Sequence, residues 1–114
     1  MRVLLATDGS DSAKAALDFL VNFPFPTGSE AIVLSVIDGK TFSEDRDLSD
    51  EQSRTIRDTR NVVQGETEKF LATEGERLRE AGWAGSTEVR YGEPADEIIQ
   101  AVEQHGVDLV VLGS

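Results

Sequence analysis

Cysteine is absent from this sequence, and histidine occurs only once, as His105. The first absence excludes disulfides, thiolate nucleophiles and cysteine-ligated metals. With no cysteine and no second histidine, His105 has neither a thiol nor another imidazole with which to form a nucleophile–base pair. We therefore expect a protein that is not an enzyme and has no metal site of its own. At the predicted end of a helix, His105 is expected to have a charge or capping role.

Basic residues are scarce, because 11 Lys and Arg stand against 22 Asp and Glu, which gives a net charge of −11. A negative field of this size repels phosphate backbones and anionic lipid head groups. We therefore expect no nucleic acid and no membrane among the partners. Arg54, Arg57 and Arg60 come nearest to a basic cluster, but their spacing is typical of a solvated helix face.

Long apolar runs are missing as well. The first apolar segment, residues 3–6, is soon followed by Asp8 and is too short for a secretory signal or a membrane span. Hydrophobic residues make up 39% and charged residues 29% of the 114 residues, as in a globular domain. We expect a cytoplasmic protein with one domain over residues 1–114.

Four segments rich in apolar and β-branched residues alternate with three segments of helical periodicity. The strand-like segments are residues 3–6, 31–37, 87–91 and 108–112, and the helical ones are residues 13–21, 49–81 and 94–105. This β-α-β-α-β-α-β order predicts an α/β fold: an open, mainly parallel, Rossmann-like sheet with right-handed crossovers and helices on both faces.

Two details of these elements are specific enough to test. In the third strand, Thr87, Val89 and Tyr91 alternate with Glu88 and Arg90, which predicts a sheet edge with one solvated face. The long middle helix should begin near Ser49 or Asp50 after a polar loop over residues 38–50, and should bend or fray at its internal glycines. The buried face of the last helix is expected at Ala95, Ile98, Ile99 and Val102.

One carboxylate stands where an open α/β sheet builds its ligand site. Asp8 follows the first buried strand directly, and the turn Asp8-Gly9-Ser10 opens the first helix. Ser10 or Asp11 can accept hydrogen bonds from the first free backbone N–H groups of that helix. A role for Asp8 itself in capping the helix is the alternative to a ligand contact.

These segments together carry a resemblance to a known family. The stretches VLLATDGSDSAKAAL, IVLSVID and GEPADEIIQAVEQHGVDLVVLGS match the pattern of the universal stress proteins over the whole chain. The chain thus resembles this family of cytoplasmic stress-response proteins, many of which bind adenine nucleotides. The resemblance implies the sheet order 3-2-1-4, followed in the family by a fifth strand that this sequence does not supply.

The resemblance also implies a ligand cleft for ATP or AMP, with Mg²⁺ only as a companion of bound nucleotide. By the resemblance, Ala6, Thr7 and Asp8 line the base and ribose, and Val36 reads the adenine edge through its backbone. A core position is the alternative for Val36. The last three residues would flank the ribose and lead into the phosphate loop: Leu112, Gly113 and Ser114.

The sequence departs from the family at that loop. Of the phosphate-binding motif G-x2-G-x9-G-[ST] it supplies only the first glycine, Gly113. We therefore expect impaired nucleotide binding and an exposed edge at the fourth strand, which favours a homodimer or another edge-strand partner. Two alternatives remain: an interaction module that binds no nucleotide, and an ATP-pyrophosphatase type of enzyme. The second alternative rests on Asp11-Ser12, which resembles the end of an S-G-G-x-D-S loop, although Asp8-Gly9-Ser10 replaces the S-G-G.

Overall fold

The computed structural model of the chain describes residues 1–38 and 49–113. The predicted polar loop falls on residues 39–48 and so lies almost wholly outside the described part, as does Ser114. Four strands and three helices alternate along the described residues: β1 (Arg2–Thr7), α1 (Asp11–Val21), β2 (Glu30–Asp38), α2 (Asp50–Glu80), β3 (Ala84–Gly92), α3 (Pro94–His105) and β4 (Leu109–Gly113).

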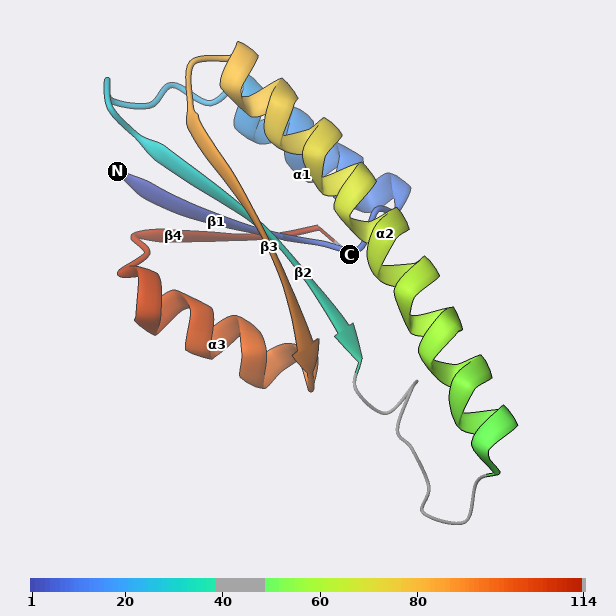
Figure 1. The fold of residues 1–114 in the computed structure, drawn as a ribbon. Helices are drawn as coiled ribbons and strands as arrows, with labels where there is room; N and C mark the ends of the chain where they lie inside the picture. The colour runs from blue at the N-terminus through green and yellow to red at the C-terminus, as the bar shows by residue number, and fades with distance from the viewer. Residues whose placement is uncertain (39–48, 114) are drawn as a thin grey trace.

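All strand pairs are parallel, and the sheet order is β3-β2-β1-β4. Helices α1 and α2 cover one face of the sheet, and α3 lies on the other (Figure 1). This confirms the predicted fold class and strand order, with β3 and β4 as the two edges. Because all four strands run in the same direction, their carboxyl ends lie at the same edge of the sheet.

The helix starts follow from local side-chain chemistry. The Ser10 hydroxyl oxygen caps α1 by accepting a hydrogen bond from the Ala13 N–H at 3.2 Å. Ser49 and Gln52 form a reciprocal capping box at the start of α2, and the predicted start of this helix near Ser49 or Asp50 is confirmed. Helix α3 begins with Pro94 in its first turn, where the missing N–H is not needed. It ends at Gly106, whose φ of 61° suits glycine.

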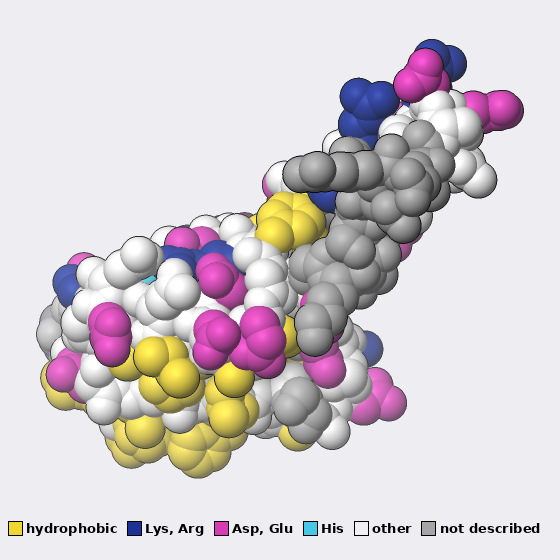
Figure 2. All heavy atoms as spheres, turned by 90° about the horizontal axis from the view of Figure 1, so that it is seen from below, with side chains coloured by type: hydrophobic (Ala, Val, Ile, Leu, Met, Phe, Trp, Pro, Cys, Tyr) yellow, Lys and Arg dark blue, Asp and Glu magenta, His cyan; other side chains and the backbone are white. Residues whose placement is uncertain are grey.

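The hydrophobic core is divided unequally between the two faces of the sheet. The larger cluster lies under α1 and α2, where Leu17, Leu20, Leu71 and Leu78 pack against β1 and β2. The smaller cluster lies under α3 and contains Leu4, Ile32, Leu34 and Ala101. Helix α3 packs on β2 and β3, so the same face of β4 remains open. Figure 2 views this side of the molecule and shows apolar side chains gathered on it.

Helix α2 is one continuous helix of 31 residues, which runs through both Gly65 and Gly75. Its second half packs on the sheet, and its first half projects beyond the carboxyl ends of the strands (Figure 1). The predicted long helix is therefore confirmed and is unbroken at both glycines, and its bending there stays a prediction. Packing of the second half, with Leu71 and Leu78 fully buried, offsets the low helix propensity of Gly75.

Two predictions about β3 and α3 need correction. The strand face with Glu88 and Arg90 is only partly solvated, because α3 covers it and leaves the two side chains 30% and 12% exposed. The Arg90 guanidinium lies 3.2 Å from a Glu88 carboxylate oxygen and 3.8 Å from one of Glu97, and it also donates to Gln104. Ala95 and Ile99 were expected to be buried, but both are exposed, Ile99 by 56%. The helix presents Ile98 and Ala101 to the sheet instead.

Candidate functional site

The carboxyl ends of β1 and β4 lie side by side at the point where the chain changes faces. After β1 the crossover helix α1 lies on one face of the sheet, and the helix that leads into β4, α3, lies on the other. In the parallel register, Ala6 is level with Leu112, and Thr7 is level with Gly113. This is the topological switch point, where open α/β sheets bind ligands.

A cavity of about 380 Å³ opens on the α3 side of this point. Its walls come from the ends of β1, β2 and β4 and from the first turns of α3. The lining residues are Ala6, Thr7, Asp8, Leu34, Val36, Pro94, Ala95, Ile98, Leu112 and Gly113. A volume of this size lies at the lower end of the range for small-molecule sites.

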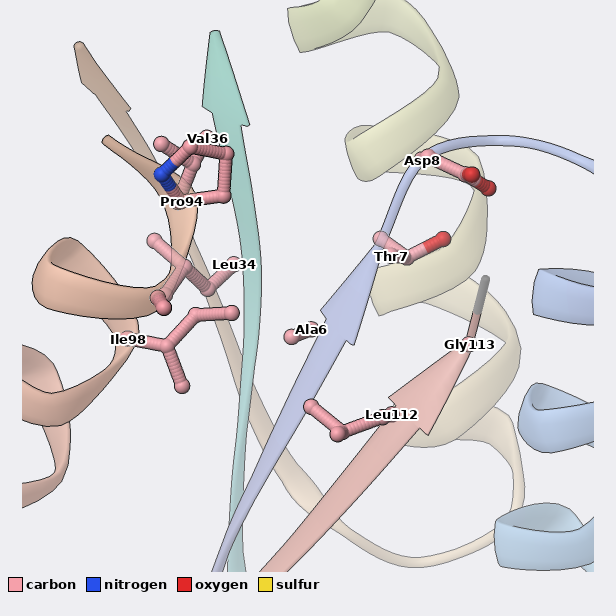
Figure 3. A pocket seen from close by; sticks show the side chains of 10 residues that line it. Ala6, Thr7, Asp8, Leu34, Val36, Pro94, Ile98, Leu112 and Gly113 are labelled. Atoms are coloured by element: carbon pink, nitrogen blue, oxygen red, sulfur yellow. The ribbon is translucent and has the colours of Figure 1, made fainter. Parts of the chain in front are cut away.

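The cavity is apolar because of strand alternation. Ala6 is level with Leu34 of β2 and with Leu112 of β4, so the three side chains project from the same face of the sheet. Figure 3 shows Leu34, Val36, Pro94 and Ile98 grouped on one side of the opening, with Ala6 and Leu112 pointing toward them. The short side chain of Ala6 leaves space between larger neighbours, as a planar ligand requires.

Thr7 and Asp8 border the cavity but turn their oxygens away from it, toward α1 and α2 (Figure 3). Asp8 Oδ1 accepts a hydrogen bond from the Ser10 N–H at 2.9 Å. Hydrogen bonds from the Ser10 side chain and backbone lower the pKa of Asp8, so this carboxylate is charged at neutral pH. Asp8 therefore supplies negative charge and an Asx turn at the rim, while the helix cap itself is Ser10.

Glycine is required at two rim positions for different reasons: Gly9 by its backbone conformation and Gly113 by packing. Gly9 has a φ of +77°, and a Cβ at this position would lie 3.4 Å from the Phe70 ring of α2. A Cβ on Gly113 would lie 2.8 Å from the Ala13 Cα and 3.3 Å from the Ala16 Cβ, both on α1. Close approach of β4 to α1 therefore explains Gly113 without any ligand.

The structure thus brings together all the predicted site residues that it describes, at one cavity, while Ser114 lies outside the described residues. Val36 is both a core neighbour and a lining residue, so the two readings of it are compatible. Sequence reasoning missed the remaining lining residues: Leu34, Pro94, Ala95 and Ile98. A signal for Leu34 was present, because it lies two residues before Val36 on a strand and hence on the same face.

His105 lies outside the cavity lining and contacts Glu88 of β3, with 3.0 Å between the Nε2 and a carboxylate oxygen. The predicted charge or capping role of His105 stays a prediction. Among the described residues, no three His, Cys, Asp or Glu side chains are grouped so that they could hold a metal ion. None of the described helices is long and apolar enough to cross a membrane.

Fold and cavity together define a class: a doubly wound parallel α/β protein with an apolar ligand cleft at its switch point. The comparisons with known proteins place the chain within that class. The universal stress protein family model matches residues 1–114. Universal stress protein YxiE of Bacillus subtilis is 33% identical over 117 residues, which cover 99% of this chain and 78% of YxiE. The chain therefore belongs to the universal stress protein family.

Solved structures agree on the fold. MJ0577 of Methanocaldococcus jannaschii has a TM-score of 0.81 at 24% identity, covering 96% of this chain and 72% of that one. An Arabidopsis thaliana family member with AMP bound has a TM-score of 0.71 at 21% identity, covering 100% and 76%. A universal stress protein in complex with cAMP has a TM-score of 0.65 at 17% identity, covering 96% and 69%.

Proposed function

We propose that the cleft binds the adenosine part of an adenine nucleotide such as ATP or AMP. The protein would then act as a cytoplasmic stress-response protein whose bound ligand alters its partners. The observation that carries this proposal is the apolar cavity at the switch point, bounded by Ala6, Val36 and Leu112. Two structural relatives bind AMP and cAMP, which supports an adenine ligand for this fold.

The proposal assigns a role to each wall of the cleft. The base enters between Ala6 and the Leu34–Val36 side, where the backbone of Val36 reads its edge. The ribose lies by Leu112 and Gly113, and the phosphates leave past Gly113, with Mg²⁺ only as their companion. Because the 114 residues supply one glycine of the phosphate motif, the binding proposed for them is weak and comes mainly from adenosine.

Calorimetric titration of the 114-residue chain with adenosine, AMP and ATP tests this proposal. Adenosine should bind, and the two nucleotides should bind little more tightly than adenosine. Sub-micromolar affinity for ATP would contradict impaired phosphate binding, and absence of adenosine binding would contradict the cleft itself. ATP incubated with the protein and Mg²⁺ should remain intact, since the proposal includes no catalytic step.

A variant that fills the cleft gives the specific control. Ala6→Leu adds three carbons on the side chain that points into the opening. Adenosine should therefore bind at least about fivefold more weakly, since overfilling a packed site costs ~1–3 kcal/mol. Ala72→Leu makes the same change at an exposed position of α2 and should leave binding unchanged. Equal binding by both variants would place the ligand elsewhere.

The second candidate is an interaction module, and the exposed edge at β4 favours it. On that edge Val110 is 38% and Leu112 is 65% exposed. A sheet edge of this kind pairs readily with another chain, and a second copy of this protein is the proposed partner. Sedimentation of the wild type should then show a dimer that Leu112→Asp dissociates, and a monomer at all concentrations would contradict this candidate.

A further inference from the structure

A buried carboxyl group lies behind the rim of the cleft. Glu74 of α2 is only 6% exposed, and its Oε1 accepts a hydrogen bond from the Thr7 hydroxyl at 3.4 Å. The same hydroxyl oxygen accepts the Gly9 N–H at 3.2 Å. Glu74 Oε2 is also buried and has no hydrogen-bond partner among the described protein groups. Burial of a carboxyl group with one free oxygen is costly and calls for an explanation.

Helix α2 supports the rim through two side chains one turn apart. The Phe70 ring packs against Gly9, and Glu74 is linked to Thr7 and through it to Gly9. The supported turn carries Asp8 and borders the cavity. The Thr7 hydroxyl therefore lies between the buried Glu74 carboxyl group and the turn that borders the cleft. The carboxyl group itself is on the α2 face of the sheet, opposite the cavity.

Few charges surround Glu74. Asp8 comes from the β1–α1 turn and Lys14 from α1, while Arg77 of α2 is engaged with Asp18 at 2.7 Å. The positions of β2 and β3 that face α2 supply one titratable group, Tyr91, whose hydroxyl bonds to Gln64. Burial raises the pKa of Glu74, and the hydrogen bond from Thr7 opposes this only in part. Glu74 thus changes charge closer to neutral pH than an ordinary glutamate does.

We propose that Glu74 is a positioning residue of the cleft, and that its charge is coupled to the binding of an anionic ligand: Glu74 takes up a proton when nucleotide phosphate binds. This inference rests on the proposed function. In the register Thr7 is level with Gly113, where the phosphates would leave the cleft. A negative charge behind Thr7 opposes a phosphate there, and protonation removes that opposition.

The hydrogen bonds to Thr7 persist in both charge states. An ionised Glu74 accepts the Thr7 O–H, whereas a protonated Glu74 donates its own O–H to the Thr7 oxygen. In the second case the remaining lone pair of that oxygen still accepts the Gly9 N–H. Protonation therefore changes the charge behind the rim without releasing the turn, and substitutions can separate charge from position.

Three variants make this separation. Glu74→Gln keeps the shape and the hydrogen bond but removes the charge, while Glu74→Leu removes both. Glu66→Gln removes one negative charge from an exposed position of the same helix and serves as the matched control. The probes are adenosine, which is neutral, and cAMP, whose single phosphodiester charge does not titrate between pH about 5 and about 8. His105 is present in all four proteins, so its contribution is common to the comparison.

Calorimetry at pH about 8 and about 5 should give a distinct pattern. Wild-type affinity for cAMP should rise roughly three- to tenfold at the lower pH, as expected for one charge at partly screened separation. Glu74→Gln should show the higher cAMP affinity at both pH values, and Glu66→Gln should follow the wild type. Adenosine should bind the wild type and Glu74→Gln equally, whereas Glu74→Leu should weaken both probes because the turn loses its support.

The failures can be told apart. If the wild type binds neither probe, the proposed function is wrong and the coupling is lost with it. If the wild type binds both probes but Glu74→Gln changes cAMP affinity no more than Glu66→Gln does, only the coupling is overturned. If Glu74→Leu binds adenosine as the wild type does, the positioning role is overturned.

Discussion

At the end of β1 the two faces of the sheet differ in kind. Ala6 faces an open apolar cavity next to α3, whereas Thr7, the following residue, faces a buried hydrogen-bonded carboxyl group next to α2. Strand alternation therefore places the ligand surface on one side and its support on the other. The shape of the cleft therefore depends also on residues behind the strand, such as Glu74, and both sides must be tested.

The largest expected difference between the two faces concerns packing. Leu71 is 1% exposed under α2, and Leu112 is 65% exposed on the α3 side of β4. Leu71→Ala should lower the free energy of unfolding by about 2–5 kcal/mol, since a cavity is left in the large cluster. Leu112→Ala should change it by no more than about 0.5 kcal/mol.

Urea unfolding followed by circular dichroism measures both changes. A loss for Leu112→Ala comparable with that for Leu71→Ala would mean that something covers β4, such as a second copy of the chain. Repeating the measurement over a range of protein concentrations would then reveal that copy, because the stability of a dimer depends on concentration.

The second prediction concerns Gly113, at the end of β4 beside α1. A Cβ there would lie 2.8 Å from the Ala13 Cα, and backbone cannot move aside as a flexible side chain does. Gly113→Ala should therefore destabilise the protein by about 1–3 kcal/mol, as overpacking does. The midpoint of thermal unfolding measures this. Lost adenosine binding with an unchanged midpoint would instead assign Gly113 to the ligand.

The third prediction concerns the pH dependence of stability. Glu74 has a pKa raised above its usual 4.5 by burial, so the folded protein holds this proton more tightly than the unfolded chain. The wild type should therefore lose stability relative to Glu74→Gln as pH rises from the ordinary glutamate range through the raised pKa. The loss amounts to about 1.4 kcal/mol for each pH unit by which the pKa is raised.

Chemical unfolding of both proteins at several pH values in that window provides the measurement. Because only the difference between wild type and Glu74→Gln is read, groups common to the two proteins cancel. A constant difference across the window would show that Glu74 is solvated in the folded state, contrary to its burial.

Much of this arrangement can be predicted from the sequence. The alternation of apolar strands with amphipathic helices fixes the α/β class, and the family pattern fixes the strand order, with Asp8 and Gly113 at adjacent strand ends. Residue chemistry predicts the start of α1 and of α2 to within one residue, and the structure selects Ser10 over Asp11 and Ser49 over Asp50 as the caps. These features depend on local sequence or on a pattern shared by the whole fold, and both can be recognised in the amino-acid sequence.

The features that sequence reasoning missed depend on how elements meet in space. Glu88 and Arg90 alternate as on a solvated face, but the sequence does not show that Glu97 and Gln104 of α3 lie over them. Glu74 is one of many acidic residues of its helix, and nothing in the sequence distinguishes it as buried. Its burial results from the packing of α2 against Thr7. Leu34, Pro94 and Ile98 join the cavity for the same reason.

The smallest expected effect compares the two halves of α2, one packed on the sheet and one projecting beyond it. A Cβ on Gly65 would meet no atom within 4 Å, whereas a Cβ on Gly75 would lie 3.1 Å from the Thr87 Cγ2 of β3. Gly65→Ala should raise the free energy of unfolding by about 0.5–1 kcal/mol, because alanine favours the helix more than glycine does. Gly75→Ala gains the same propensity but must displace Thr87, so its net gain should be smaller by at least about 0.5 kcal/mol.

Gly75→Ala in a Thr87→Ser background separates the two terms, since serine lacks the methyl group that the new Cβ would meet. In that background the gain from Gly75→Ala should approach the gain from Gly65→Ala, as measured by urea unfolding. If Gly75→Ala is equally stabilising in the wild-type and Thr87→Ser backgrounds, then β3 adjusts to the new methyl group at little energetic cost. The support that α2 gives to the rim through Phe70 and Glu74 would then be looser than the contacts of Gly9 and Thr7 imply.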